Sequence, residues 1–212
     1  MKKEIDLLQF QAVKRVLGKR KEKHREIARR FDREFFDGER DTGYGGYAYD
    51  GRWRPVALRM LLHYALAEGA SRVLDVGCGK GFLVKDFRAI GIRAYGIDIS
   101  AYAISQSVEP LYTMVGDARH LPALLHQAAQ VDLAVSINTL HNLERDELAR
   151  ALQAMMTLSR HQYVTLDAWR NDEERERMLA WNLTAKTLMH VDEWQEFFLQ
   201  VGYTGDYSWF IP

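Results

Sequence analysis

The feature that constrains this chain most is a glycine-rich turn directly after a short apolar run. The run Arg72–Val76 has the β-branched and aliphatic composition of a buried strand, and glycines follow it at positions 77, 79 and 81. Glycine lets the backbone turn sharply and approach a ligand where a Cβ atom would collide. Residues 82–90 continue at helical period, so the amides of the turn lie at a helix start, where they favour an anionic group. The spacing differs from the Gly-x-Gly-x-x-Gly of dinucleotide-binding folds, and a tight turn without a ligand remains the alternative for this motif alone.

Beyond residue 71, short apolar runs alternate with segments of helical period. Strands are predicted at Arg72–Val76, Arg93–Ile97, Thr113–Val115, Val131–Ile137, Tyr163–Leu166 and Tyr203–Phe210. Helices are predicted between and after them at Phe82–Ile90, Glu144–Leu158, Asp172–Trp181 and Val191–Val201. Buried strands separated by helices predict an α/β fold, in which helices cover both faces of a mostly parallel sheet.

The first forty residues differ from the rest of the chain. They hold 13 Lys and Arg against 8 Asp and Glu, although the whole chain has 29 of each. Apolar residues at helical spacing predict amphipathic helices over about 3–17 and 21–37. Residues 41–50 contain three glycines and three tyrosines, which fit neither a regular element nor a simple flexible linker. We therefore divide the chain into an N-terminal helical lid, 1–54, and a main domain, 55–212.

Pro55 suits the first turn of a further helix, because its φ is already helical and its missing N–H would have no partner there. This helix is expected to run to about Glu68. Its inward face is predicted to consist of Leu58, Leu61, Leu62 and Ala65.

Composition excludes several classes of protein. With 212 residues, 47% of them apolar, the chain is long and apolar enough for one soluble domain with a core. The single cysteine, Cys78, excludes an internal disulfide framework and a cysteine-cluster zinc site, and the histidines lack ligand spacing, so no metal is expected. No apolar run approaches the roughly 18–20 residues that span a bilayer, and the charged start lacks a signal peptide. We expect a cytoplasmic protein without membrane contact, whose oligomeric state the sequence leaves open.

Polar residues follow three further predicted strands. Asp98 comes after the second strand, 21 residues past Gly77, where a carboxylate can accept both hydroxyls of a ribose. Gly116-Asp117-Ala118 follows the third strand, and Asn138-Thr139-Leu140-His141-Asn142 follows the fourth. Open α/β sheets bind their ligands at the carboxyl ends of the strands, so these residues mark the candidate site.

The runs 73–81, 96–100 and 116–118, in this order and at these distances, resemble a class I S-adenosylmethionine-dependent methyltransferase over about residues 55–210. The resemblance implies the Rossmann-like fold of that class and S-adenosylmethionine as cofactor. It implies that the methionine and sugar portion of the cofactor is surrounded by Asp75, Gly77, Cys78, Gly79 and Gly81. It further implies that Asp98 holds the ribose, that Ile99 lies against the adenine, that Asp117 accepts from the adenine amine, and that Ala118 offers its backbone.

Two details of the resemblance bear on the ends of the chain. Residues 44–55 (Tyr-Gly-Gly-Tyr-Ala-Tyr-Asp-Gly-Arg-Trp-Arg-Pro) are similar to the start of a bacterial subgroup of these enzymes, for which the resemblance indicates no acceptor. Class I methyltransferases close their sheet with an antiparallel hairpin, yet only one clear strand follows the last helix here. The other arm is either missing or lies within 183–190.

Methyl transfer from a sulfonium is an in-line displacement, which requires alignment, exclusion of water and, for some nucleophiles, a base. His141 is the best candidate base, because it follows the fourth strand, where the acceptor meets the methyl group in this class, and because histidine titrates near neutrality. Packing or capping at a helix start is the alternative for His141. Asn138, at the same strand end, is assigned to the cofactor.

The remaining candidates form the walls of the site. Tyr44 and Tyr47 are expected to line the acceptor pocket, and Tyr47 also to contact the cofactor and assist catalysis, since aromatic faces favour a sulfonium. Arg52 is expected to pair with the cofactor's carboxylate or with an anionic substrate. Trp169 and Trp181 form the opposite wall. For each of them, packing is the alternative.

The sequence thus predicts a methyltransferase that acts on an oxygen, nitrogen or carbon of a small polar molecule. A methyltransferase acting on RNA or DNA is the first alternative, invited by the basic N-terminus. It is disfavoured because acids interleave with the basic residues and because the Asp/Asn-Pro-Pro-aromatic turn of enzymes acting on base amino groups is absent after the fourth strand. A non-catalytic, cofactor-binding scaffold subunit is the second.

Overall fold

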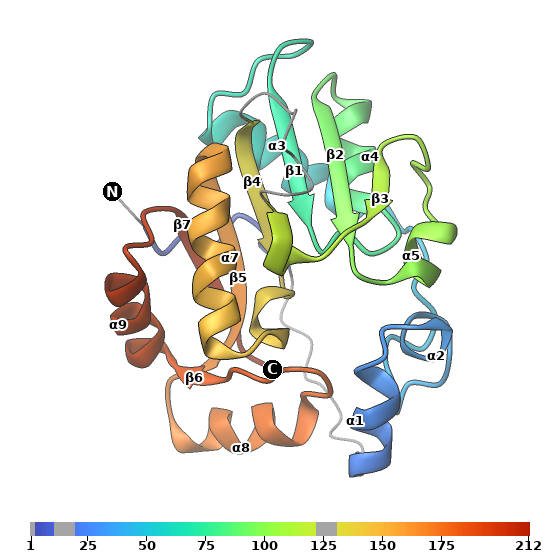
Figure 1. Ribbon diagram of the computed structural model, residues 1–212, viewed down its shortest axis with the longest axis vertical. Coiled ribbons are helices and arrows are strands. Elements are labelled where there is room, and N and C mark those ends of the chain that lie inside the picture. Colours follow the sequence, from blue (N-terminus) through green and yellow to red (C-terminus); the bar gives the residue numbers. More distant parts are fainter. Residues whose placement is uncertain (1–2, 11–19, 122–130) are drawn as a thin grey trace.

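One sheet of seven strands organises the computed structural model, which describes residues 3–10, 20–121 and 131–212 (Figure 1). Its strands are β1 (Arg72–Val76), β2 (Arg93–Asp98), β3 (Thr113–Val115), β4 (Val131–Ile137), β5 (Ser159–Trp169), β6 (Met189–His190) and β7 (Asp206–Phe210). The order is β3-β2-β1-β4-β5-β6, and β7 pairs with β5. The pairing is parallel at each of these contacts.

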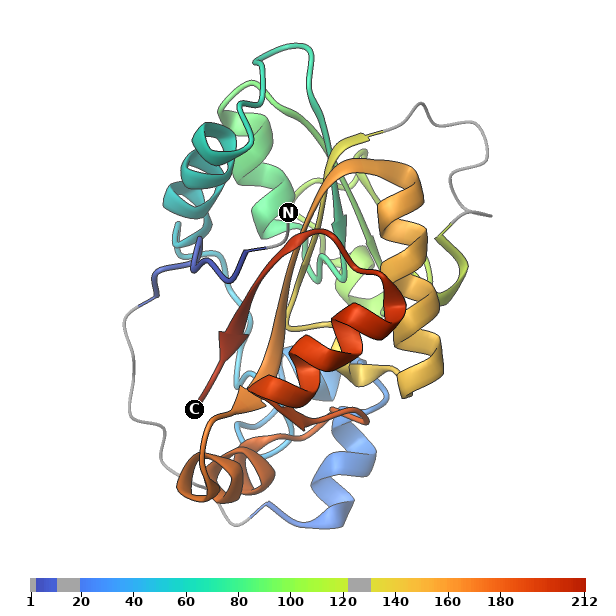
Figure 2. The ribbon, with the colours of Figure 1, turned by 90° about the vertical axis from the view of Figure 1, so that its left-hand side faces the viewer.

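Helices cover both faces of the sheet, as Figure 2 shows. The helices are α1 (Glu22–Ala28), α2 (Arg33–Phe36), α3 (Trp53–His63), α4 (Phe82–Ala89), α5 (Ala101–Ser105), α7 (Arg145–Leu158), α8 (Asp172–Trp181) and α9 (Val191–Val201), with 3-10 turns η1 (Ala118–His120) and η2 (Leu140–Asn142). One core cluster packs α3 and α4 against β1, and the other packs α7 and α9 against β4 and β5. The predicted Rossmann-like α/β fold is therefore confirmed, and α7, α8 and α9 lie close to their predicted positions.

The first predicted helix is wrong where the structure describes it. Residues 3–10 run beside β7 instead. Glu4 forms a parallel bridge with Tyr207, and the Ile5 amide donates to the Tyr207 carbonyl at 2.8 Å. Leu7 and Leu8 are buried, and the Leu7 amide donates to the hydroxyl of Tyr163. An edge strand offers unpaired backbone groups, so pairing with β7 replaces local helix formation. Residues 11–17 of the predicted helix lie outside the described residues.

The second predicted helix, 21–37, is divided into α1 and α2. Phe31 has a φ of 51°, which no helix accommodates, and it breaks the chain between them. Asp32 then caps α2, because its side chain accepts from the amide of Glu34 at 3.0 Å. Aspartate is a preferred N-cap residue, so Asp32 was a sequence signal for this helix start. The helical period over 21–37 outweighed that signal, because it predicted one continuous helix.

The predicted inward face of the helix after Pro55 is wrong except at Leu61, which is partly buried and packs against the core. Leu58 and Leu62 are 43% and 76% exposed, whereas Val56, Ala57 and Met60 are fully buried. The helix ends at His63, before the predicted end. The chain offers two apolar stripes on this helix, and only the packing against α4 and β1 decides between them.

The C-terminal end of the sheet shows no antiparallel hairpin in the described part of the chain. The segment 183–190 contributes only the two-residue strand β6, which pairs in parallel with the end of β5. β7 begins at Asp206, later than predicted, and β5 extends beyond its predicted bounds in both directions. Residues 3–5 pair with β7 instead, so they cover part of the sheet edge that a hairpin would otherwise cover.

Candidate functional site

The glycine-rich turn joins β1 to α4 and places backbone at the carboxyl edge of the sheet. Gly77 has a φ of 86°, and a Cβ atom on it would lie 2.2 Å from Oγ1 of Thr139. A Cβ atom on Gly79 would lie 3.2 Å from the ring of Tyr47. Both positions therefore require glycine. A side chain at position 77 would collide with the loop after β4, and one at position 79 would press against Tyr47 of the lid. Gly81 caps α4 and lies against Ser107 and Thr113.

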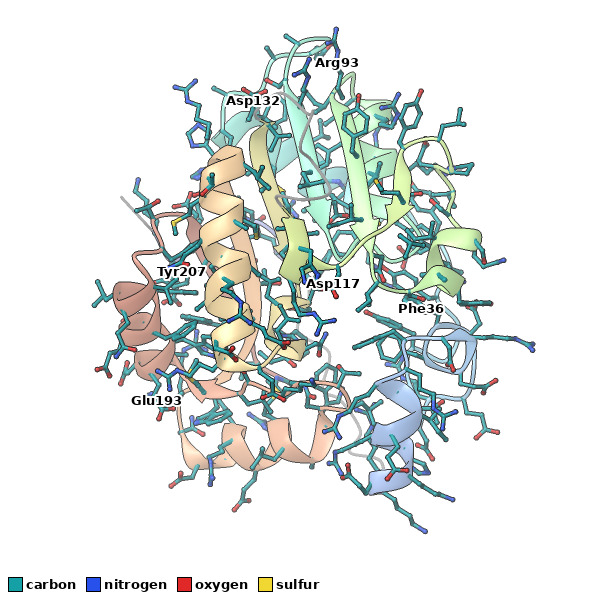
Figure 3. All side chains as sticks on the ribbon, viewed as in Figure 1. Phe36, Arg93, Asp117, Asp132, Glu193 and Tyr207 are labelled. Carbon is teal, nitrogen blue, oxygen red and sulfur yellow. The ribbon has the colours of Figure 1, made fainter. Side chains whose placement is uncertain are left out.

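A cavity of about 770 Å³ lies over this edge, between the strand ends and the N-terminal lid. In Figure 3, Asp117 at the sheet edge and Phe36 of α2 come from opposite sides of it. Most of the predicted site residues line the cavity, namely Tyr44, Tyr47, Arg52, Asp75, Gly77, Cys78, Gly79, Asp98, Ile99, Asp117, Ala118, Asn138, His141 and Trp181. The structure places Gly81 and Trp169 outside its lining. Trp169 instead pairs with His190 of β6 and lies under the guanidinium of Arg175.

Two buried carboxyl groups dominate the electrostatics at the ends of β1 and β2. Burial, together with the nearby charge of Asp98, raises the pKa of Asp75 to about 8. Burial also raises the pKa of Asp98, although its oxygens accept from the amides of Gly79 and Ser100, both at 2.8 Å. Among the described residues, none donates a hydrogen bond to the Asp75 carboxyl. A cationic ligand group would relieve the repulsion between the two carboxylates, so this end of the cavity favours positive charge.

Beside this pair, the lining is less polar. Cys78 is buried, and burial raises the pKa of its thiol, so it is not a reactive thiolate. Ile99 exposes 51% of its surface next to the strand end, which suits contact with a flat apolar ring. Ala118 begins η1 and packs against the core on its other side.

Asp117 is held by Arg119 at the end of β3. The two side chains form an ion pair with a shortest distance of 2.5 Å, and Arg119 also pairs with Glu147 at 3.1 Å. Hydrogen bonding from Arg119 keeps the pKa of Asp117 below its usual value. The carboxylate already accepts from the amide, Nε and Nη2 of Arg119, so a hydrogen bond from a ligand would compete with these contacts.

Tyr47 joins the lid to the glycine-rich turn. Its ring stacks on Phe82 with centroids 4.8 Å apart and lies 4.4 Å from the ring of Tyr44. Burial, and then the neighbouring Tyr44 and Asp75, raise the pKa of Tyr47 well above its usual value. The phenol therefore stays protonated and can serve as a hydrogen-bond donor but not as a base near pH 7.

Asp37 anchors the lid and was not foreseen from the sequence. Its carboxylate accepts from Nζ of Lys80 and from the Tyr102 hydroxyl, each at 2.7 Å, and from the amide of Tyr47 at 3.1 Å. Burial alone would raise the pKa of Asp37, but the hydrogen bonds from Lys80 and Tyr102 bring it below its ordinary value. The sequence feature that pointed to such a partner was Lys80. A lysine inside a turn between buried residues needs a carboxylate nearby.

Arg52 lines the cavity, but its charge is paired within its own loop. Its guanidinium lies 2.5 Å from the carboxylate of Asp50, and both side chains are largely exposed. Pairing with the cofactor or a substrate would require Arg52 to exchange this partner.

His141, Asp167 and Asn182 form an interlocked buried cluster at the ends of β4 and β5. The Asp167 amide donates to Nδ1 of His141 at 3.2 Å, and Nε2 lies 3.6 Å from Oδ2 of Asp167. Asn182 donates to the same Oδ2 at 2.5 Å. Burial lowers the pKa of His141, and the charge of Asp167 opposes this only in part. His141 is therefore neutral near pH 7, with the hydrogen-bond pattern assigning its proton to Nε2.

Asp167 was missed because the fifth strand was predicted to end at Leu166, so its acid was not grouped with the other strand-end residues. The rule that identified Asp98 and Asp117 applies to it equally. Asn138, which the same rule identified, has a φ of 49° and is held there by hydrogen bonds with Thr165. Backbone in this region is strained for asparagine, and such strain is typical of functional sites.

The sheet is open and parallel, with a glycine-rich turn after β1, carboxylates at the end of β2 and after β3, and a cavity above them. These features define a Rossmann-like nucleoside-binding protein. Residues 49–204 match a family described as a methyltransferase domain. The match covers well over half of the chain, so the chain belongs to this family. The predicted methyltransferase class is confirmed.

Solved structures with the same fold include methyltransferases. A SAM-dependent methyltransferase from Archaeoglobus fulgidus matches with a TM-score of 0.55 and 19% identity, over 71% of this chain and 68% of that one. A magnesium protoporphyrin IX methyltransferase from Synechocystis, with bound SAH, has a TM-score of 0.53 and 15% identity over 71% of each chain. Several others are matched over only 44–47% of their own length. No curated protein matches the sequence.

The predicted S-adenosylmethionine-dependent enzyme and its cofactor agree with this family and with these neighbours. The roles of individual residues, the division at residue 54 and the bacterial subgroup stay predictions. Within the described residues, no helix is long and apolar enough to cross a membrane, and no group of three His, Cys, Asp or Glu is placed to hold a metal ion.

Proposed function

We propose that this protein transfers the methyl group of S-adenosylmethionine to an oxygen, nitrogen or carbon of a small polar molecule. The observation that carries the proposal is a single cavity that both the glycine-rich turn and the N-terminal lid line. Its volume of about 770 Å³ falls within the range of pockets that enclose small organic ligands, roughly 300–1,000 Å³. A lid over the strand ends would help to shield the cofactor and the acceptor from water.

The residues at the strand ends fit the cofactor. Gly77 and Gly79 leave no Cβ atom on the turn, and the Asp75 and Asp98 carboxyls favour a cation. Asp98 would hold the ribose hydroxyls, Ile99 would pack on the adenine, and Asp117 would accept from its amine. When bound, S-adenosylmethionine supplies a methyl group on a positively charged sulfur, which the acceptor's nucleophile displaces in line.

The acceptor side would be formed by the lid and by the cluster after β4 and β5. Tyr47 covers Gly79, and its protonated hydroxyl would donate a hydrogen bond to a bound ligand. A proton released by the acceptor would be taken up by the carboxylate of the His141–Asp167 pair, in which His141 Nε2 lies 3.6 Å from Oδ2. Asn182 orients this carboxylate, and the Asp167 amide fixes the ring of His141.

The proposal is tested by supplying the protein with S-adenosylmethionine that carries a labelled methyl group, together with a bacterial cell extract. Label is expected in the small-molecule fraction, and Asp98→Ala should reduce it. Label confined to RNA or DNA, with steeply salt-dependent binding, would favour the nucleic-acid alternative. Binding of S-adenosylhomocysteine without label in any fraction would instead indicate a non-catalytic subunit.

A further inference from the structure

The two sides of the cavity carry opposite charge. Outside the lid, the lining contains five acids, Asp75, Asp98, Asp117, Glu147 and Asp167, and two bases, Arg119 and Lys186. The lid contributes five arginines and one carboxylate, that of Asp50. The arginines are Arg20, Arg29, Arg30, Arg40 and Arg52. The positive charge and the hydrogen-bond donors of the cofactor account for Asp75, Asp98 and Asp117, but these groups do not account for the basic lid side.

The partners of these arginines show where positive charge remains. Arg52 is held by Asp50, and Arg29 is paired with Glu22 at 3.1 Å. Arg40 donates to the main-chain carbonyl of Tyr44, which leaves its charge unbalanced. Among the described residues, no carboxylate lies within ion-pair distance of Arg30 or Arg40. These two guanidiniums therefore keep their charge available to a ligand in the cavity.

Apolar rings accompany the arginines at this end. Phe31, which follows Arg30, meets Phe35 edge to face with centroids 5.2 Å apart. Trp181 lies 4.8 Å from Phe210, and the guanidinium of Arg20 lies over its ring. All of these side chains line the cavity.

This end is built where α1 meets α8, since Nη2 of Arg25 donates to the Leu179 carbonyl at 3.1 Å (Figure 1). Asp75 and Asp98, at the ends of β1 and β2, and Asp117, after β3, come from the sheet edge instead. The basic, aromatic end and the acidic end are thus assembled from different parts of the chain.

We propose that the lid side of the cavity is an anion subsite, which binds a methyl acceptor with a carboxylate or phosphate beside an apolar body. Guanidinium groups bind both anions through paired hydrogen bonds, and the neighbouring aromatic rings offer contact to an apolar body. This inference rests on the proposed function, because it assigns the acidic side to the cofactor. The cofactor's own carboxylate is the other possible source of the anion, and the experiment separates the two.

The test uses the full chain saturated with S-adenosylhomocysteine and three probes of similar shape: naphthoate, naphthyl phosphate and the neutral naphthamide. Their binding is measured by calorimetry. Naphthoate or naphthyl phosphate is expected to bind at least about tenfold more tightly than naphthamide, as for one charge-assisted hydrogen-bonded pair. Which of the two anions binds more tightly identifies the preferred group.

Arg30→Gln and Arg40→Gln should abolish this preference without changing the affinity for S-adenosylhomocysteine. Lys23→Gln is the matched control, because it removes one positive charge from α1 at an exposed residue outside the cavity lining. Equal binding of the anionic and neutral probes overturns the inference. So does a loss of S-adenosylhomocysteine affinity in the arginine variants, because the anion bound would then be the cofactor's carboxylate. Failure of the unaltered protein to bind S-adenosylhomocysteine would contradict the proposed function itself.

Discussion

The sheet edge and the lid contribute to the same cavity, but they are built in different ways. At the sheet edge, each functional residue stands at or near a strand end, and for all of them except Asp167 the position of that end follows from local sequence. In the lid, two short helices and a glycine-rich loop are held by contacts with distant residues, such as Asp37 with Lys80 and Arg25 with Leu179. Rigid strand ends suit the shared chemistry of the cofactor, whereas a surface-built lid suits a variable acceptor.

The largest expected effect is a loss of stability on replacing a glycine. It compares Gly77 at the sheet edge with Gly51 in the lid, which have similar backbone conformations. Gly77 and Gly51 have φ values of 86° and 80°, but a Cβ atom would meet Thr139 at Gly77 and nothing within 4 Å at Gly51. Gly51→Ala should lower the free energy of unfolding by about 1–2 kcal/mol, the cost of left-handed backbone. Gly77→Ala should lower it by about 3 kcal/mol or more, because the clash adds to the strain. Urea unfolding of both variants measures the difference, and equal losses would remove the argument for close packing at Gly77.

The next effect tests the cofactor side directly. Asp98→Ala should weaken S-adenosylhomocysteine binding by about 1–3 kcal/mol, the range for a lost hydrogen bond to a charged group. Calorimetry measures the affinity. Asp146→Ala, which removes an exposed carboxylate on α7, serves as control and should leave it unchanged. An undiminished affinity in Asp98→Ala would exclude Asp98 from the site.

A pH dependence should distinguish the cofactor from its product. With a pKa of about 8, Asp75 is mostly protonated at pH 7 in the free protein, and a bound cation lowers that pKa. Affinity for S-adenosylmethionine should therefore rise from pH 7 to about 8.5, by at most tenfold per pH unit, with release of a proton. S-adenosylhomocysteine lacks the sulfonium charge and should show a smaller rise. Calorimetry in buffers of different ionisation enthalpy detects the proton, and identical profiles for both ligands would contradict this account.

The same contrast explains what could be predicted from the sequence. Gly77, Asp98, Asp117 and Asn138 follow strands whose apolar composition marks them, so local rules placed all four in the cavity lining. Asp167 also lies near the carboxyl end of a strand. Its strand, β5, extends beyond the apolar residues 163–166 that marked it in the sequence, so its true end was not recognised.

The lid residues had no such local marker. Residues 3–10 have an apolar pattern that suits a helix, and only the open edge of β7 draws them into strand pairing. The role of Asp37 depends on Lys80, 43 residues away, and no periodicity reports a contact at that separation. On α3, the helical period predicted Leu58 and Leu62 on the inward face, but packing against α4 and β1 buries Val56, Ala57 and Met60 instead.

The smallest expected effect tests whether the lid depends on the cofactor turn. Asp37→Asn keeps the shape of the side chain but removes the charge that balances Lys80, whose side chain is only 11% exposed. Because Asp37 itself is partly exposed, we expect a loss of only about 1 kcal/mol in S-adenosylhomocysteine affinity, seen mainly as a dissociation rate about fivefold higher. Stopped-flow displacement measures that rate, and Asp41→Asn, an exposed acid of the same lid, is the control. If Asp37→Asn releases the ligand no faster than Asp41→Asn, the lid and the glycine-rich turn act independently, and the Asp37–Lys80 pair only stabilises the fold.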